Sequence, residues 1–125
     1  MEGVFTAVAD PLLQDALLGL IRRIAGDVPV GIRQWDELQP GHVVVTSSND
    51  CSLAQCAGLS GRGVQVIVLA PVPTALQRDA YQRAGSTAYL PMEVNHEPLR
   101  AAISLATYAS GEQFLRPFQT FGGNQ

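Results

Sequence analysis

The chain has 125 residues, of which 46% are hydrophobic and 15% are charged, and its formal net charge is −3. This length fits one domain with a real core, and the composition is too apolar for a disordered chain. The eight basic residues are all arginines scattered along the sequence, so we expect no direct binding of nucleic acid. No apolar run is long enough to span a membrane and no secretory signal is evident, which predicts a cytoplasmic protein.

The first part of the chain alternates between strand-like and helix-like segments. The apolar run Val4–Ala9 predicts a buried strand. Asp10 in the N-cap position and Pro11 directly behind it begin a helix, which Gly26 ends. A weaker strand is expected over Pro29–Trp35, followed by at most one helical turn in "DELQPG".

The rest of the chain continues the same alternation. The run "HVVVTS" predicts a third strand, and a helix capped by Asn49 or Asp50 follows in "DCSLAQCAGLSG". Val64–Ala70 is the clearest strand of the sequence. The remaining expected elements are a helix with a Thr74 and Gln77 capping box and a Gly85 C-cap, a strand in "TAYL", and a last helix stopped by Gly111.

Five short strands that alternate with helices predict a parallel sheet covered on both faces, in a three-layer α/β/α sandwich. We expect one such domain over residues 1–111 and a tail or linker over residues 112–125. Ligands of open parallel sheets bind beyond the carboxyl ends of the strands. The segments expected at that edge are Ala9–Asp10, Thr46–Asp50, Ala70–Pro71 and Pro91–Met92.

The order and lengths of these elements resemble the receiver domain of bacterial response regulators. The phrases "DPLLQDALLGLI", "QRAGSTAYLPM" and "LRAAISLATYASGEQFLRP" carry the resemblance, which covers about residues 4 to 117. The last phrase resembles the final helix and linker of receivers that precede a helix-turn-helix DNA-binding domain. The resemblance implies a flavodoxin-like fold with (βα)5 topology.

In the family that the chain resembles, phosphorylation uses an acidic pair after strand one, an Asp ending strand three, a Thr or Ser ending strand four and a Lys ending strand five. Here the acidic pair falls on Val8 and Ala9, with Asp10 one place late. The phosphoacceptor position falls on Ser47, or on Thr46 if the strand is one residue shorter. A single carboxylate is a poor magnesium anchor, so we expect no metal and no cofactor.

The other positions of the family pattern also differ. Strand four ends in Ala70, which has no hydroxyl, and the Lys position holds Met92 in a chain without any lysine. Tyr89 matches the aromatic residue whose rotation accompanies activation in ordinary receivers. The sequence therefore predicts a pseudo-receiver, with the receiver fold but without phosphorylation. Its degenerate pocket is expected to be lined by Ala9, Asp10, Ser48, Ala70 and Met92.

Several residues at or near this edge also have a purely structural interpretation. Asp10 is expected to cap a helix and not to bind metal, and capping is preferred for Asp50 over a position in the vacant acceptor site. Met92 is expected to fill the space of a Lys with apolar atoms. Cys51 and Cys56 are expected to be free thiols that pack in the core, on adjacent faces of one helix.

An enzymatic role is not expected. The hydroxyls of Thr46, Ser47 and Ser48 need a base within hydrogen-bond reach to act as nucleophiles. His42 is expected at the opposite end of the sheet, and His96 is only a weak candidate for that base.

Two surfaces are candidates for binding a partner. Leu105, Tyr108 and Ala109 extend the apolar arc of the last helix, and the resemblance implies a homodimer through helix four, strand five and helix five. Three phenylalanines of the tail, at positions 114, 118 and 121, are expected to dock on this domain, on a partner subunit or on a further domain. A partly disordered linker is the alternative. The residues of the tail cluster are Phe114, Phe118 and Phe121.

These features predict a phosphorylation-independent receiver-like domain of a bacterial transcription regulator, which acts by dimerisation or partner binding and has a possible attached or partner DNA-binding domain. The alternative is a small-molecule sensor that admits a metabolite to the degenerate pocket formed by Ala9, Ser47, Ser48 and Ala70.

Overall fold

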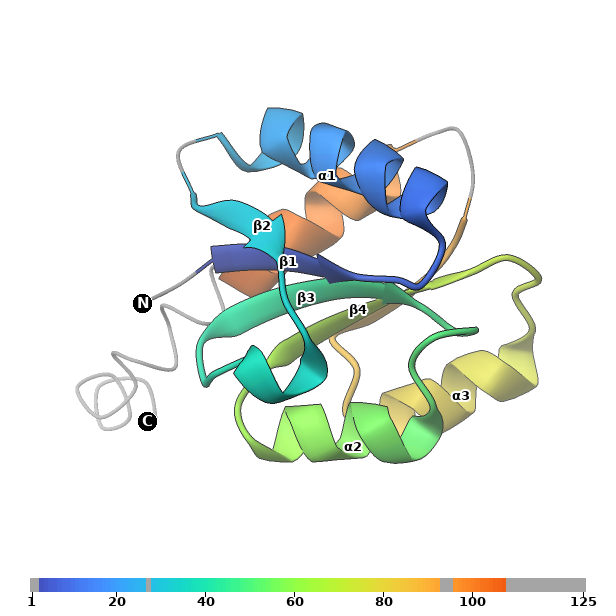
Figure 1. Ribbon diagram of the computed structural model, residues 1–125. Helices are drawn as coiled ribbons and strands as arrows, with labels where there is room; N and C mark the ends of the chain where they lie inside the picture. Colours follow the sequence, from blue (N-terminus) through green and yellow to red (C-terminus); the bar gives the residue numbers. More distant parts are fainter. Residues whose placement is uncertain (1–2, 27, 93–95, 108–125) are drawn as a thin grey trace, which may run out of the picture.

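The computed structural model contains a five-stranded parallel sheet with helices on both of its faces (Figure 1). Residues 3–26, 28–92 and 96–107 are described by the structure. The strands follow the order β2-β1-β3-β4-β5, and each neighbouring pair is parallel. The strands are β1 (Gly3–Ala7), β2 (Val30–Ile32), β3 (His42–Ser47), β4 (Gln65–Ala70) and β5 (Ala88–Pro91). The helices are α1 (Pro11–Ala25), the 3-10 turn η1 (Trp35–Glu37), α2 (Leu53–Gly61), α3 (Ala75–Arg83) and a helix over residues 97–107.

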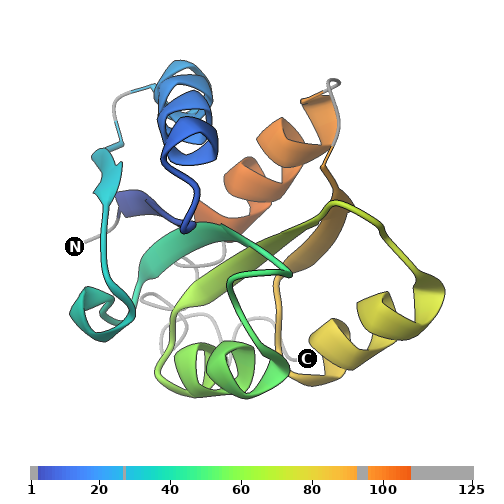
Figure 2. The ribbon, with the colours of Figure 1, turned by 45° about the vertical axis from the view of Figure 1, so that its right-hand side comes forward.

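The sheet separates two apolar layers, which confirms the predicted α/β/α sandwich. Helix α1 and the helix over 97–107 cover one face, and α2 and α3 cover the other (Figures 1 and 2). Side chains of a strand point alternately to the two faces, so both layers draw on the same strands. The first layer contains Val4, Val8, Val43, Val45, Ile67, Leu17 and Ile21 with Leu99, Ala102, Ile103 and Ala106, and the second contains Phe5, Val44, Val66, Val68, Cys56, Tyr81 and Tyr89.

Two of the predicted helix starts are confirmed. The Asp10 carboxylate accepts hydrogen bonds from the first amides of α1, with Pro11 behind it and Gly26 at the C-cap. Thr74 caps α3 through a hydrogen bond from the Gln77 amide to its hydroxyl. In both cases a short polar side chain satisfies amides that have no partner within the helix.

The predicted cap of the next helix is wrong. Ser52 caps α2 through a hydrogen bond from the Gln55 amide, so neither Asn49 nor Asp50 occupies that position. The chain first makes a tight turn after β3, in which the amides of Asp50 and Cys51 both donate to the carbonyl of Ser47. Cys51 therefore precedes the helix and does not share it with Cys56, which corrects a second expectation.

The segment that connects β2 to β3 contains the shortest helical element among the described residues. The weak strand expected over Pro29–Trp35 contracts to Val30–Ile32, and the single helical turn expected in "DELQPG" is a 3-10 turn that begins earlier, at Trp35–Glu37. By contrast, α1, α2 and α3 have 15, 9 and 9 residues. The cleft described below lies beside η1.

Candidate functional site

Asp50 joins two loops at the carboxyl edge of the sheet. Its Oδ2 accepts a hydrogen bond from the Ser47 hydroxyl at 2.6 Å, and its Oδ1 accepts one from the Ala9 amide at 3.2 Å. Ser47 ends β3 and is only 2% exposed. The position that aligns with the phosphoacceptor therefore holds a buried hydroxyl that already donates to a neighbouring carboxylate.

The alternative acceptor position is also closed. Thr46 is fully buried, and its hydroxyl donates to the carbonyl of Ala7 on the adjacent strand at 2.6 Å. Ala70, at the end of β4, is fully buried and brings no hydroxyl to this edge. Neither the Ser47 hydroxyl nor the Thr46 hydroxyl is therefore exposed to solvent as a nucleophile.

The carboxylate of Asp10 is engaged elsewhere. It accepts hydrogen bonds from the Leu12 amide at 2.9 Å and from the Leu13 amide at 3.4 Å, as the cap of α1. Within residues 3–26, 28–92 and 96–107, no three side chains of His, Cys, Asp or Glu are grouped so that they suit a metal ion. The carboxylates of Asp10 and Asp50 at this edge thus accept hydrogen bonds from backbone amides and from the Ser47 hydroxyl.

Met92 follows β5, and its amide donates to the carbonyl of Ala70 at 2.9 Å. Its side chain packs against the apolar layer on the α1 face. It also lines a small, mainly apolar cavity of about 140 Å³ together with Leu90 and His96. If a lysine replaced Met92, its ammonium group would face a mainly apolar wall, and no described carboxylate lines this cavity.

Tyr89 is buried on the opposite face of the sheet. Its ring stacks on Tyr81 with 5.8 Å between centroids and an interplanar angle of 24°. Its hydroxyl donates to Oε1 of Gln77 and accepts the Thr74 amide at 3.4 Å. Tyr89 therefore takes the role that the capping-box prediction gave to the Gln77 side chain, and it ties β5 to the start of α3.

Tyr81 continues this connection to the β3–α2 turn. Its hydroxyl donates to the carbonyl of Cys51, and it also lies 3.4 Å from the carbonyl of Ser48. Burial, followed by the nearby Cys51, raises the pKa of the Tyr81 hydroxyl. The two tyrosines thus link α3 and β5 to the turn that carries Asp50.

The cysteines are free and buried, as predicted. Burial raises the pKa of the Cys51 thiol to about 12, with smaller contributions from Cys56 and Asp50. Burial also raises the pKa of Cys56. Both groups are therefore thiols at neutral pH, which suits core packing and not nucleophilic chemistry.

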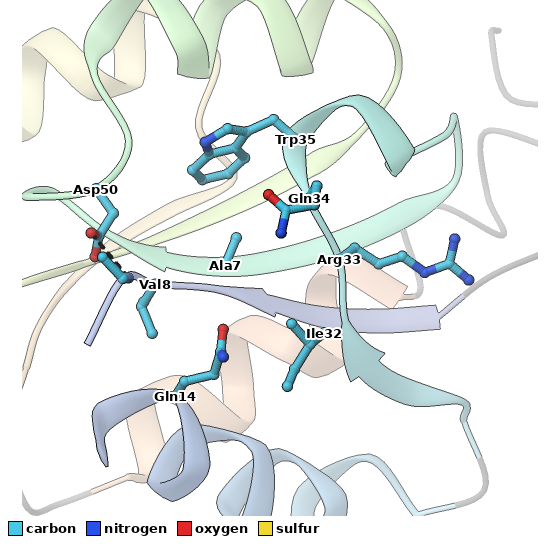
Figure 3. Close-up of a pocket in the computed structure, with 9 residues that line it drawn as sticks. Ala7, Val8, Gln14, Ile32, Arg33, Gln34, Trp35 and Asp50 are labelled. Carbon is cyan, nitrogen blue, oxygen red and sulfur yellow. Dashed lines mark hydrogen bonds between the residues drawn. The ribbon is translucent and has the colours of Figure 1, made fainter. Parts of the chain in front are cut away.

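A cleft of about 370 Å³ lies beside this edge, between α1, the end of β2 and η1 (Figure 3). Only one of the residues expected to line the degenerate pocket lines this cleft, namely Ala9, whereas the others do not: Asp10, Ser47, Ser48, Ala70 and Met92. Arg33, Gln34 and Trp35 reach the cleft just after β2, and the weak strand pattern over Pro29–Trp35 does not predict that these side chains lie at the carboxyl edge of the sheet. The cleft is lined by Ala7, Val8, Ala9, Gln14, Ile32, Arg33, Gln34, Trp35 and Asp50.

The structure describes part of the candidate interface. Leu105 is 59% exposed and Leu76 on α3 is 80% exposed, so both present apolar surface to solvent. Tyr108, Ala109, Phe114, Phe118 and Phe121 lie outside the described residues. His42 begins β3, at the end of the sheet opposite Ser47, as predicted. No helix of the described chain has the length and apolar character needed to cross a bilayer.

The strand order and the layers define a flavodoxin-like α/β fold of the receiver-domain kind. Neither a protein-family model nor a curated protein matches the sequence. Several solved structures do match in fold. A DNA-binding response regulator of the LuxR family from Staphylococcus aureus has 17% identity and a TM-score of 0.67, over 86% of this chain and 99% of that one.

Two other neighbours cover the same share of this chain. A putative pilus assembly-related protein from Burkholderia pseudomallei has 17% identity and a TM-score of 0.73, over 90% of its length. A response regulator receiver protein from Pseudoalteromonas atlantica has 13% identity and a TM-score of 0.68, over 98% of its length. At these identities the likeness establishes the fold.

Proposed function

We propose that this chain is a receiver-like signalling domain that works without phosphorylation, as part of a bacterial transcriptional response regulator. It is a cytoplasmic binding module and not an enzyme, it uses no cofactor, and it acts by forming a homodimer or by contacting a partner. The observation that carries the proposal is the hydrogen bond from Ser47 to Asp50, because it occupies the position of the phosphoacceptor.

Three further features support the absence of phosphorylation. Ser47 is buried, so a phosphodonor has no access to its hydroxyl without opening the turn. Ala70 supplies no hydroxyl to bind a phosphoryl group, and Met92 supplies no positive charge to neutralise it. Phosphoryl transfer depends on such charge neutralisation, so the loss of all these groups together removes the chemistry.

Intact-mass spectrometry after incubation with acetyl phosphate and Mg²⁺ tests this part of the proposal. We expect no adduct, while a phosphorylatable receiver treated in parallel gains one phosphoryl mass. A stable adduct on the wild-type chain that disappears in Ser47→Ala overturns the proposal.

The dimer is proposed through α3, β5 and the helix over 97–107. The exposed apolar side chains of Leu76 and Leu105 support this face, since burying them on association is favourable. Light scattering of wild type and of a Leu76→Asp/Leu105→Asp variant tests it. A dimer that the double variant dissociates supports the face, whereas a wild-type monomer at high concentration leaves partner contact as the mode of action.

A role related to pilus assembly is a second candidate, favoured by the likeness to the putative pilus assembly-related protein. The reading frame beyond Gln125 separates the candidates. A helix-turn-helix domain there supports the transcriptional role, and a different domain favours the assembly role.

A further inference from the structure

The cleft beside η1 contains several polar side chains from separate elements. Gln14 comes from α1, while Gln34 and Trp35 follow β2. Figure 3 shows the amide groups of Gln14 and Gln34 directed toward the same space in front of β1, with the Trp35 ring above them. This arrangement places two hydrogen-bonding amides beside one large aromatic surface.

Trp35 is held in place by contacts outside the cleft. Its carbonyl accepts a hydrogen bond from Nη2 of Arg62 at 2.9 Å, and its side chain packs against the apolar layer that contains Leu59. A fixed aromatic wall loses little side-chain entropy when a ligand stacks on it. Trp35 therefore provides a prepared stacking surface.

The charges around the cleft disfavour an anionic ligand. One acidic residue, Asp50, lines the cleft. Arg33 also belongs to the lining, but its guanidinium is placed 4.7 Å from the centroid of the Phe5 ring, and Figure 3 shows it directed away from Gln14 and Asp50. No other described side chain of the lining is cationic.

We propose that this cleft binds a small, uncharged planar heterocycle with adjacent hydrogen-bond donors and acceptors, of the kind found in the base of a nucleoside. The base stacks on Trp35, and the Gln14 and Gln34 amides each offer one acceptor and two donors to its edge. Paired donor and acceptor groups of a glutamine amide match the edge of a purine, and aromatic side chains stack on any base. A volume of about 370 Å³ accommodates such a ring.

The cleft adjoins the acceptor position through Asp50, but the Ser47 hydroxyl does not line it, and the residues assigned to the ligand are Gln14, Gln34 and Trp35. The proposal therefore does not depend on whether Ser47 is phosphorylated. Trp35 is the single tryptophan of the chain, and its emission reports directly on the cleft. Titration with adenosine, guanosine, cytidine and uridine is expected to change that emission in a saturable way for at least one nucleoside. Ribose alone is expected to have no effect.

Gln14→Ala tests the residues that the proposal assigns. Alanine is a strong helix former, so α1 is expected to persist in the variant. Loss of one amide contact is expected to weaken binding about 10-fold. Gln82→Ala is the matched control, since Gln82 is an exposed glutamine of α3 and does not line the cleft; its affinity is expected to equal that of wild type.

Three outcomes overturn the proposal. One is the absence of any saturable change in Trp35 emission at millimolar nucleoside. Another is equal affinity for wild type, Gln14→Ala and Gln34→Ala, which places the ligand elsewhere. The third is tighter binding of adenosine monophosphate than of adenosine, because it assigns the affinity to a phosphate. Phosphorylation by acetyl phosphate overturns the signalling proposal alone and leaves these titrations unaffected.

Discussion

The carboxylate of Asp50 lies between the Ser47 hydroxyl and the Ala9 amide, and it hydrogen-bonds to both. One side chain thereby joins the end of β3 to the loop that leads from β1 into α1. Both contacts of this carboxylate are therefore made with groups of the chain itself.

Replacement of Asp50 by Ala is expected to lower the free energy of unfolding by about 1–3 kcal/mol, because it leaves the buried Ser47 hydroxyl without its acceptor. Urea unfolding measures the change. Asp79→Ala, at an exposed position of α3, is the control and is expected to shift the free energy by less than about 0.5 kcal/mol. Equal effects of the two substitutions contradict the bridging role of Asp50.

Tyr89→Phe removes the hydroxyl that connects the Thr74 amide to the Gln77 side chain. We expect a loss of about 1 kcal/mol in the free energy of unfolding and faster amide hydrogen exchange in the first turn of α3. Gln82→Ala, at an exposed position in the last turn of the same helix, is expected to leave that exchange unchanged. Unaltered exchange in Tyr89→Phe shows that the hydroxyl does not hold the helix start.

Met92→Lys restores the residue type that the resemblance places after strand five. We expect no phosphorylation of this variant, since Ser47 and Ala70 still lack the other groups. The ammonium group meets an apolar cavity wall, so the free energy of unfolding is expected to fall by about 1–3 kcal/mol. Met92→Leu, which preserves the apolar character, is expected to cost less than about 1.5 kcal/mol. Gain of a phosphoryl adduct in Met92→Lys is the contrary result.

His42 is expected to make the protein less stable in mild acid. Burial lowers the pKa of His42 below 6.5, and the nearby Arg33 lowers it further. The unfolded chain therefore binds a proton that the folded chain disfavours, and the free energy of unfolding falls as the pH drops below about 6.5. Protonation also removes the Nδ1 lone pair that accepts the Gln39 amide at 3.0 Å.

Urea unfolding between roughly pH 8 and pH 5.5 measures this dependence. In His42→Gln the free energy of unfolding is expected to vary less over the same range. An unchanged pH dependence in the variant assigns the effect to other groups.

Strong local signals made much of the fold predictable. Asp10 before Pro11 specifies a helix start by cap geometry alone, and the β-branched run of β3 specifies a buried strand. The spacing of Leu99, Ala102 and Ile103 indicates the buried face of the last helix, and all three are buried. These elements depend on neighbours in sequence, so a pattern of residues is sufficient to identify them.

The contacts of the site were not predictable in the same way. Asp50 resembles a helix cap in its local sequence. The turn after Ser47 instead brings its carboxylate to the amide of Ala9, which is 41 residues away in the sequence. The Tyr89 hydroxyl likewise finds its partners on another element. Gln14, Gln34 and Trp35 are brought to one cleft only by the pairing of β1 with β2, a tertiary contact without a signal in either segment.

The short crossover between Ile32 and His42 gives this part of the domain freedom to vary in length. Trp35 and Leu38 are the residues of this crossover that contribute to the second apolar layer, and closing a longer surface loop after them costs little additional entropy. Residues inserted between η1 and β3 therefore have room to reshape or fill the cleft while the strand order stays the same. The hollow beside Trp35 is thus the part of the described domain whose walls an insertion changes without altering the order of the strands.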